Sequence, residues 1–548
     1  MTTPATSAPP SPAHEYPHYV SSILSAMEGR PDGVALHWRD RTVTAGTLVE
    51  AVVRAAVVLK SNGVGRGTAV GVLTEPNSPD TLVARYAANL LAAGVVHLRS
   101  ANAASSAEVL PVSAQVAVLQ EAGVSVLIVD GANADRAREI GARMPRPPAV
   151  ACFGASVPGF LDLTESVAGD RPVGHHELVA DGKGALGAIT YTSGSTGQPK
   201  GIRRALSAWN HSVAATRDAS THPRMLVTTP LSHTVAPMVD ATLASGGSIV
   251  LHEEFTAGAV LEAIAVHRIT RTLLATPHIY QLLDHPDFAS TDTSSLQQVM
   301  YGGCPASAAR LEQAMAAFGP VLIQTYGTTE SWGISVLTPP EHFRPELLAS
   351  VGRPLPGVGV VIRDPETGQD LPVGATGEVC VRSPVMMTEY CSAAELTRRV
   401  LRDGWLHTGD LGHFDGEGYL YLVGRLSDVI KTNGVKIHPA AVENALMSHP
   451  GIAQAAVYGV RDTDQVEHVY AVVVPSPGVD AGSELTADRL RDHVAGLLSP
   501  QHAPAAVLVR TRIPLTASGK PDKRRLLAGT PVPHPTAPSD GAAIEKGR

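Results

Sequence analysis

A short loop combines hydroxyl side chains, glycines and one lysine, which together suit an anion such as phosphate. Residues 191–201 read Tyr-Thr-Ser-Gly-Ser-Thr-Gly-Gln-Pro-Lys-Gly and directly follow the apolar run 185–189. Hydroxyls donate hydrogen bonds, glycines let backbone N–H groups approach an anion closely, and lysine supplies a point charge. A flexible Ser/Gly linker fits less well, because linkers rarely open on a strand-like run and close on Pro-Lys-Gly. The predicted phosphate contacts are Thr192, Ser193, Gly194, Ser195, Thr196, Gly197 and Lys200.

The spacing of this loop differs from that of the commonest nucleotide-binding loop. The pattern Gly-x-x-x-x-Gly-Lys-Ser/Thr is absent, since Lys200 is followed by glycine. The loop therefore does not belong to a Walker-type ATPase. It is similar to the phosphate loop of the adenylate-forming superfamily, which contains acyl-CoA ligases, nonribosomal adenylation domains and luciferases.

A carboxylate and several hydroxyls follow a second apolar run at 321–323. Residues 324–330 read Gln-Thr-Tyr-Gly-Thr-Thr-Glu, and we expect a loop at the carboxyl end of a strand, where open α/β sheets bind ligands. The resemblance implies that Glu330 helps to hold the magnesium of Mg-ATP and that Thr329 contacts phosphate. Mg²⁺ prefers one or two carboxylates plus substrate phosphates, which agrees. A turn with a solvated glutamate is the alternative. The neighbouring nucleotide contacts would be Thr325, Tyr326, Gly327 and Thr328.

Residues 301–305 form a glycine-containing turn after the strand-like run 296–300. A backbone without side chains admits a flat ring, and in similar enzymes this segment lines the adenine and acyl pockets. By itself such a turn mostly marks a tight bend. The resemblance assigns Gly302, Gly303 and Cys304 to the nucleotide and Tyr301 to the acid.

Two further motifs match the superfamily in order along the chain. Asp410, in Trp-Leu-His-Thr-Gly-Asp, corresponds to the aspartate that accepts hydrogen bonds from the ribose hydroxyls, and a carboxylate suits a diol with two donors. Arg425 corresponds to an arginine that reaches the nucleotide. Ser427 and Asp428 fall where the hinge between the two domains is expected. Lys431, at the end of the same segment, is predicted to contact substrate.

Lys520, in Pro-Leu-Thr-Ala-Ser-Gly-Lys, resembles the C-terminal lysine that delivers one cation to the adenylation site. The attacking carboxylate and the pentavalent phosphorus centre are both negative, so a lysine between them lowers the cost of approach. The alternative is a surface turn before the basic run 523–525. We expect Lys520, Glu330, Thr329 and Lys200 to be the catalytic residues.

The acid pocket is expected after the phosphate loop, where Pro-Leu-Ser-His resembles an element of acyl and aryl ligases. His233 would gate this pocket, and Val235, Val239 and Trp332 would line it. Asp240 has two interpretations: it caps a helix starting near Ala241, which we favour, or it holds the amine of an amino-acid-like substrate. An aryl or medium acyl acid would suit these residues.

Alternating helix-like and strand-like stretches indicate an α/β fold with parallel sheets. They occur over residues 17–165 and 205–337, with, for example, helices expected over 44–62 and 78–93. Short strands broken by Gly and Pro predict a small β subdomain from 351 to 381. The expected organisation is a disordered tail (1–14), an N-terminal AMP-binding domain of two parallel-sheet subdomains plus the β subdomain (15–423), a smaller mobile α+β C-terminal domain (424–528) and a second disordered tail (529–548).

Composition restricts the partners of the protein. A chain of 548 residues exceeds one ordinary core, and a formal charge of -8 gives no reason to expect nucleic acid. No run of about 18 apolar residues predicts a membrane span, and the first residues do not resemble a signal peptide. The four cysteines lack metal-ligand spacing, which favours reduced, structural thiols in a cytoplasmic protein. The oligomeric state stays open.

The resemblance covers about residues 20–528 and implies that ATP, with Mg²⁺, adenylates a small carboxylic acid and releases pyrophosphate. Transfer to a thiol such as CoA would follow. The open alternatives are a carrier protein, an amino-acid-type substrate, and activation of nitrite for diazotisation of an aminoaryl acid. Residues 96–100, Val-His-Leu-Arg-Ser, depart from the proline-rich stretch usual in similar enzymes and suggest a specialised biosynthetic branch. A non-catalytic nucleotide-binding scaffold would have no need for Lys520, Glu330 and Lys200 to converge.

Overall fold

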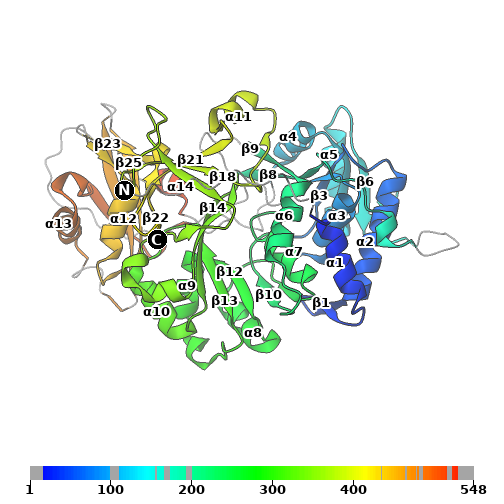
Figure 1. The fold of residues 1–548 in the computed structure, drawn as a ribbon, viewed down its shortest axis with the longest axis horizontal. Helices are drawn as coiled ribbons and strands as arrows, with labels where there is room; N and C mark the ends of the chain where they lie inside the picture. The colour runs from blue at the N-terminus through cyan, green and yellow to red at the C-terminus, as the bar shows by residue number, and fades with distance from the viewer. Residues whose placement is uncertain are drawn as a thin grey trace.

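The computed structural model describes residues 16–98, 110–154, 157–165, 173–192, 200–432, 435–462, 466–476, 478–479, 485–514 and 521–528. Two large, mostly parallel sheets carry most of the first 350 residues, and helices cover their faces (Figure 1). The helices are α1 (Tyr19–Glu28), α2 (Ala45–Ser61), α3 (Pro79–Leu90), α4 (Val112–Ala122), α5 (Ala134–Ala142), α6 (Leu206–Thr216), α7 (Ala236–Ala244), α8 (Ala257–His267), α9 (Thr276–Leu283), α10 (Ala308–Phe318), α11 (Ala394–Val400), α12 (Pro439–Met447), α13 (Ala487–Leu497) and α14 (Lys523–Ala528).

One large sheet has eight strands, and its centre is parallel. The strand that enters the phosphate loop and the strand that leaves it form an antiparallel pair at one side of this sheet. In spatial order the strands are β19 (Glu389–Tyr390), β9 (Lys200–Ala205), β8 (Leu186–Thr192), β4 (Gly94–His97), β3 (Ala69–Leu73), β5 (Val124–Asp130), β6 (Ala149–Phe153) and β7 (Leu161–Asp162).

The other large sheet has nine strands and is parallel through β11, β10, β12, β13 and β14. In spatial order its strands are β16 (Arg353–Pro354), β15 (Trp332–Leu337), β14 (Leu322–Thr328), β13 (Gln298–Gly302), β12 (Arg271–Ala275), β10 (Arg224–Val227), β11 (Ser248–Leu251), β1 (Val34–Trp38) and β2 (Arg41–Thr44). The prediction of two similar parallel-sheet subdomains is confirmed.

Local sequence explains where the helices between these sheets begin. The side chain of Thr44 accepts a hydrogen bond from the backbone N–H of Thr47 at the start of α2, and Ser78 does the same for Thr81 at the start of α3. Both are N-caps, which satisfy backbone donors that the first helical turn leaves free. The expected helices over 44–62 and 78–93 therefore begin where these hydroxyls indicate.

A third, antiparallel sheet forms the small β subdomain, and it is larger than predicted. The expected limits were 351 and 381, but the sheet continues to Arg425 because β21 and β22 pair with the earlier strands. Its strands are β17 (Gly359–Arg363), β18 (Gly377–Arg382), β20 (Leu401–Arg402), β21 (Trp405–Phe414) and β22 (Leu420–Arg425).

The C-terminal part has small sheets and its own apolar core. The core contains Ile430, Val442, Leu446, Val457 and Ala471 among others. In Figure 1 this part, drawn yellow-orange to red with α12 and α13, lies at the opposite end of the molecule from α1 and α2. Its strands are β23 (Ile430–Thr432), β24 (Val435–Ile437), β25 (Ile452–Arg461), β26 (Glu467–Pro475) and β27 (Ala506–Val509). None of the helices in the described ranges is both long and apolar enough to cross a membrane.

Candidate active site

The structure brings the hairpin of the phosphate loop next to the Thr329–Glu330 turn. Strand β8 ends at Thr192 and β9 begins at Lys200, and these two residues pair across the hairpin. The loop between them, Ser193 to Gly197 included, lies outside the described residues. Strand β19 pairs with β9 on its other side, and residues of both strands contact the turn. Two segments more than a hundred residues apart thus meet at one place.

The Glu330 carboxylate accepts a hydrogen bond from a tyrosine that no sequence motif indicated. The hydroxyl of Tyr390, on β19, donates a hydrogen bond of 2.7 Å to Glu330 Oε1. The backbone N–H of Met387 donates to the Glu330 carbonyl at 2.7 Å. Burial, with the Glu330 charge second, raises the pKa of Tyr390, so its hydroxyl stays a donor. Tyr390 thereby holds the carboxylate in place, and among the described residues the hydrogen bond engages Oε1 and leaves Oε2 for a cation.

Arg204 joins the phosphate hairpin to the same turn. It lies on β9 with only 3% of its surface exposed, and its guanidinium donates to the backbone carbonyls of Thr329 and Val385. The guanidinium also lies over the Trp332 ring, 4.0 Å from its centroid. Burial lowers the pKa of Arg204 to about 9, and the Glu330 charge opposes that shift. A buried cation therefore sets the position of the turn that carries Thr329 and Glu330.

The turn itself is shorter than predicted. We expected residues 324–330 to form a loop after a strand ending near 323, and this was wrong: β14 continues to Thr328 because it pairs in antiparallel fashion with β15. Thr325, Tyr326, Gly327 and Thr328 are therefore strand residues. At the end of the strand the Thr328 hydroxyl accepts a hydrogen bond from the Ser331 N–H at 3.1 Å, which closes the turn.

A second group of polar side chains surrounds Asp410. The Tyr326 hydroxyl donates to Asp410 Oδ2 at 2.7 Å, and Arg425 Nε lies 2.9 Å from Asp410 Oδ1. The Asp410 charge is the main cause of a raised pKa at Arg425, and burial followed by the same charge raises the pKa of Tyr326. Tyr326 lies on β14, which ends at Thr328 just before Glu330, so its hydrogen bond to Asp410 links this group to the Glu330 turn.

The glycine turn after β13 approaches β14 closely. A Cβ on Gly302 would lie 2.3 Å from the Thr325 carbonyl oxygen, and Gly303 has a φ of +91°. Neither position accepts a side chain without displacement or strain. The Thr325 hydroxyl donates to the Tyr301 carbonyl at 3.2 Å, and the Thr276 hydroxyl donates to the Cys304 carbonyl at 3.1 Å. The segment is thus a rigid strip of backbone, as contact with a flat ring would require.

His233 lies in the turn before α7, beside a histidine of the unusual stretch 96–100. Burial lowers the pKa of His233, so its imidazole is neutral at neutral pH. His97 ends β4, and burial with the nearby charges of Arg85 and His233 lowers its pKa to about 3. His97 and Ser232 line a small pocket between the end of β4 and the segment that follows β10. The departure from the superfamily at His97 is therefore next to the predicted acid pocket.

Both interpretations of Asp240 were wrong. Helix α7 begins at Ala236, so Asp240 lies in mid-helix and cannot cap it. Its side chain has no exposed surface, and Arg85 binds both carboxylate oxygens, at 2.7 and 2.6 Å. Tyr86 Oη and Trp209 Nε1 donate to the same oxygens, at 2.6 and 2.8 Å. The carboxylate is a fully engaged structural charge that a substrate amine cannot reach.

The remaining pocket residues are mostly packed inside the protein. Val235, Val239 and Tyr301 are at most 1% exposed, and the Tyr301 hydroxyl lies 3.0 Å from His342 Nε2. Their assignment to the acid pocket stays a prediction. Trp332 opens β15 with a φ of +58°, an uncommon conformation for a bulky residue, and its ring stands edge-on to Trp209. Backbone strain of this kind concentrates at functional sites.

The predicted hinge residues Ser427 and Asp428 contact each other, and Asp428 lies near the start of α14. Ser427 donates to Asp428 at 2.9 Å, and Lys523 lies 3.9 Å from Asp428. Lys431 is exposed on β23. Lys520 lies outside the described residues. The hinge role of 427–428 and the catalytic role of Lys520 stay predictions.

Comparisons with known proteins identify the family of the chain. A family described as "AMP-binding enzyme" matches residues 24–391, and "AMP-binding enzyme C-terminal domain" matches residues 441–520. The chain belongs to this family of adenylate-forming enzymes, and it is an ATP-dependent, AMP-forming ligase.

Full-length relatives include both CoA ligases and an amide-forming enzyme. The medium/long-chain-fatty-acid–CoA ligase FadD8 of Mycobacterium tuberculosis is 32% identical over 94% of this chain and 90% of its own length. The feruloyl-CoA synthase of an Amycolatopsis species is 34% identical over 89% and 94%. The solved structure of the amide bond synthetase McbA from Marinactinospora thermotolerans is 36% identical over 93% of this chain and 99% of its own, with a TM-score of 0.82.

Proposed function

We propose that the enzyme adenylates an aryl or medium-chain acyl acid and then transfers the acyl group to a thiol such as CoA. The observation that carries the first step is the meeting of the phosphate hairpin with the Thr329–Glu330 turn through Arg204 and Tyr390. This arrangement suits a nucleoside triphosphate whose phosphates lie between the loop and the carboxylate. Feruloyl-CoA synthase and FadD8, as relatives, support aryl and acyl substrates respectively.

The residues present fit a magnesium ion. Glu330 offers one carboxylate oxygen beside the oxygen that accepts from Tyr390, and Thr329 adds a hydroxyl to the same turn. Mg²⁺ is usually bound by one or two carboxylates together with substrate phosphates and water. When bound, the ion would neutralise charge on the phosphates. Lys200 at the base of the loop would add a further positive charge, and Asp410 would accept from the ribose hydroxyls while Arg425 holds that carboxylate.

The reaction needs little covalent chemistry from the protein. The carboxylate of the acid attacks the α-phosphorus in line, the bond to the β-phosphate oxygen breaks, and pyrophosphate leaves. Positioning the two reactants and neutralising their charges supply most of the rate enhancement in such a step. Lys520, brought in by the C-terminal domain, is assigned to this charge neutralisation.

Exchange of labelled pyrophosphate into ATP, measured across a panel of aryl and acyl acids, tests the first step. We expect exchange that depends on the acid and on Mg²⁺. Intact ATP binding without exchange for any acid would contradict the proposal and favour the non-catalytic scaffold.

An amine acceptor is the second candidate for the transfer step. It is favoured by the likeness to the amide bond synthetase McbA over almost the whole of both chains. Mass spectrometry of products formed with the best acid, in separate reactions with CoA, with a panel of amines, with a carrier protein and with nitrite, would decide between the acceptors. A CoA thioester as the fastest product is expected, and an amide formed faster than the thioester would establish the second candidate instead.

A further inference from the structure

The segment that carries Asp410 is a bulge, not a regular strand. In the pairing of β18 with β21, Cys380 faces His407 and Glu378 faces Leu411. The ladder therefore advances two residues on β18 and four on β21, and 408–410 stand out opposite a single residue. Bulges of this kind occur beside active sites and redirect side chains. Gly409, at the apex, has a φ of +72° with open space around its Cβ position, so the backbone conformation alone explains the glycine.

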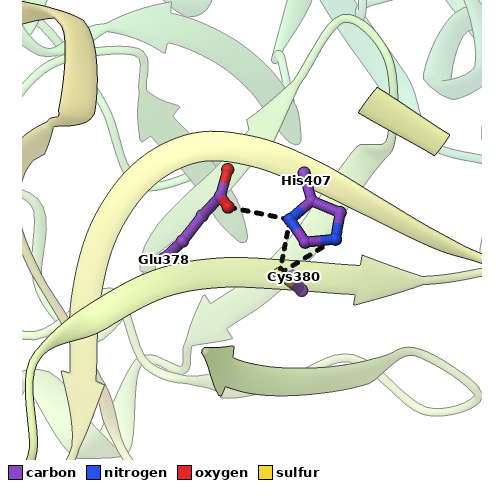
Figure 2. Close-up of side chains that lie close together, drawn as sticks. All are labelled: Glu378, Cys380 and His407. Atoms are coloured by element: carbon purple, nitrogen blue, oxygen red, sulfur yellow. Dashed lines mark hydrogen bonds and ion pairs between the residues drawn. The ribbon is translucent and has the colours of Figure 1, made fainter. Parts of the chain in front are cut away.

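Glu378 supplies the hydrogen bond that the bulge removes from the ladder. Its Oε1 accepts from the backbone N–H of Gly409 at 3.1 Å. Its Oε2 lies 2.7 Å from His407 Nδ1, and a dashed line marks this contact in Figure 2. The hydroxyl of Thr408 completes the arrangement, because it donates to the Val379 carbonyl at 2.7 Å and accepts from the Asp410 N–H at 3.0 Å. The side chains of Glu378 and Thr408 thus hold the backbone of the bulge by hydrogen bonds.

The same cluster could be read as a metal site, but its contacts argue against an ion. Glu378, Cys380 and His407 bring three possible ligand atoms within 4.8 Å of one another (Figure 2). However, both Glu378 oxygens already have partners, and the Arg402 guanidinium lies 2.7 Å from His407 Nδ1. Burial, with the Glu378 charge second, raises the pKa of the Cys380 thiol to about 12, so the sulfur is protonated. The positive charge of Arg402 and the neutral thiol of Cys380 both disfavour a bound cation, so these side chains form a hydrogen-bonded cluster.

We infer that Glu378 is a positioning residue for nucleotide recognition: by holding the Gly409 N–H, it aims Asp410 at the ribose. The inference rests on the proposed function, which gives Asp410 that contact. Glu378 lies on β18, and its two oxygens face the Gly409 N–H and His407 Nδ1, so it acts through the bulge backbone and not by touching ATP. Thr408 also positions the bulge, through its hydrogen bond to the Val379 carbonyl. Cys380 makes no bond to the bulge backbone in the described structure.

The test compares binding of ATP with binding of 3′-deoxy-ATP by calorimetry on the full chain, without acid. The wild-type protein should bind ATP more tightly than 3′-deoxy-ATP. Glu378→Ala should weaken ATP binding about tenfold, the usual effect of losing a hydrogen bond to a charged acceptor, and should remove most of the preference for ATP. Glu378→Gln keeps an oxygen that can face Gly409 and should restore binding to within about threefold. In an Asp410→Ala background, Glu378→Ala should add nothing.

Cys380→Ala is the matched control, since it alters the same buried cluster without touching the bulge, and it should leave nucleotide discrimination unchanged. Wild-type affinity and discrimination in a folded Glu378→Ala protein would overturn the inference. It would also be overturned if Cys380→Ala lost as much ATP affinity and discrimination as Glu378→Ala and the purified protein carried a stoichiometric metal. If Glu378→Ala does not fold, Thr408→Val, which removes the tie to Val379, must give the same loss of discrimination. Failure of pyrophosphate exchange in the wild type would instead contradict the proposed function, because these binding measurements do not depend on chemistry.

Discussion

The substitution Asp240→Asn tests whether this carboxylate holds the fold together or binds substrate. In the structure four donors converge on two oxygens: two guanidinium nitrogens of Arg85, the Tyr86 hydroxyl and the Trp209 indole N–H. Asparagine keeps the shape but turns one oxygen into an amino group. At least one donor then faces another donor, and the buried Arg85 charge loses its counterion.

The magnitude follows from burial and geometry. The side chains of Arg85 and Asp240 are 1% and 0% exposed, and their closest atoms lie 2.6 Å apart. A unit charge pair about 4 Å apart interacts by about 4 kcal/mol at an effective dielectric constant near 20. Removing one partner of a buried ion pair typically costs about 3–5 kcal/mol, because the other charge stays buried without compensation. We expect Asp240→Asn to destabilise the N-terminal domain by an amount in this range.

Urea denaturation followed by tryptophan fluorescence measures the effect, since Trp209 contacts the pair directly. Glu417→Gln is the matched control: Arg344 binds Glu417 at two points in the same geometry, both at 3.0 Å, but on the surface, so little change is expected. The apparent KM for the acid should not change in Asp240→Asn protein that is folded. A wild-type denaturation midpoint combined with altered selectivity between acids with and without an amine would refute the structural assignment.

Two further substitutions test the catalytic assignments. Tyr390→Phe removes the hydrogen bond to Glu330 and should leave stability unchanged. It should raise the Mg²⁺ concentration for half-maximal pyrophosphate exchange roughly fivefold, which corresponds to about 1 kcal/mol. An unaltered Mg²⁺ requirement would show that the bond does not position the carboxylate. Lys520→Ala should lower acid-dependent exchange by roughly 10²–10³-fold while ATP binding persists, as for loss of one group that stabilises a charged transition state. Lys60→Ala, at the exposed end of α2, is the control, and equal exchange in the two variants would remove the role assigned to Lys520.

Local sequence predicted those features that depend on local interactions. The helices expected over 44–62 and 78–93 form, because Thr44 and Ser78 cap them locally, and the glycine turn at 302 forms because close backbone approach requires glycine. The end of β14 was not visible, because it depends on antiparallel pairing with β15 and not on the composition of 324–328. The family could be identified from motifs that occur in the expected order along the chain, because each motif keeps the residue types that its chemistry requires.

The errors concern side chains whose partners are distant in sequence. Asp240 meets Arg85 from 155 residues away, and Tyr390 meets Glu330 from 60 residues away, so no local pattern contains either contact. A partial signal did exist: a carboxylate within an apolar stretch, as at Asp240 in α7 or Glu378 in β18, is expensive to bury unless it is paired. Such residues are candidates for structural or positioning roles before substrate contacts are considered.

The most direct test of the central claim follows oxygen atoms through the reaction. The acid that gives the fastest exchange is labelled with ¹⁸O in both carboxylate oxygens, and the AMP formed during complete turnover is analysed by mass spectrometry. Attack of the carboxylate on the α-phosphorus, at a site built from the phosphate loop, Glu330 and Asp410, predicts one ¹⁸O atom in each AMP molecule. Unlabelled AMP, or label recovered in inorganic phosphate with ADP as the nucleotide product, would contradict the account.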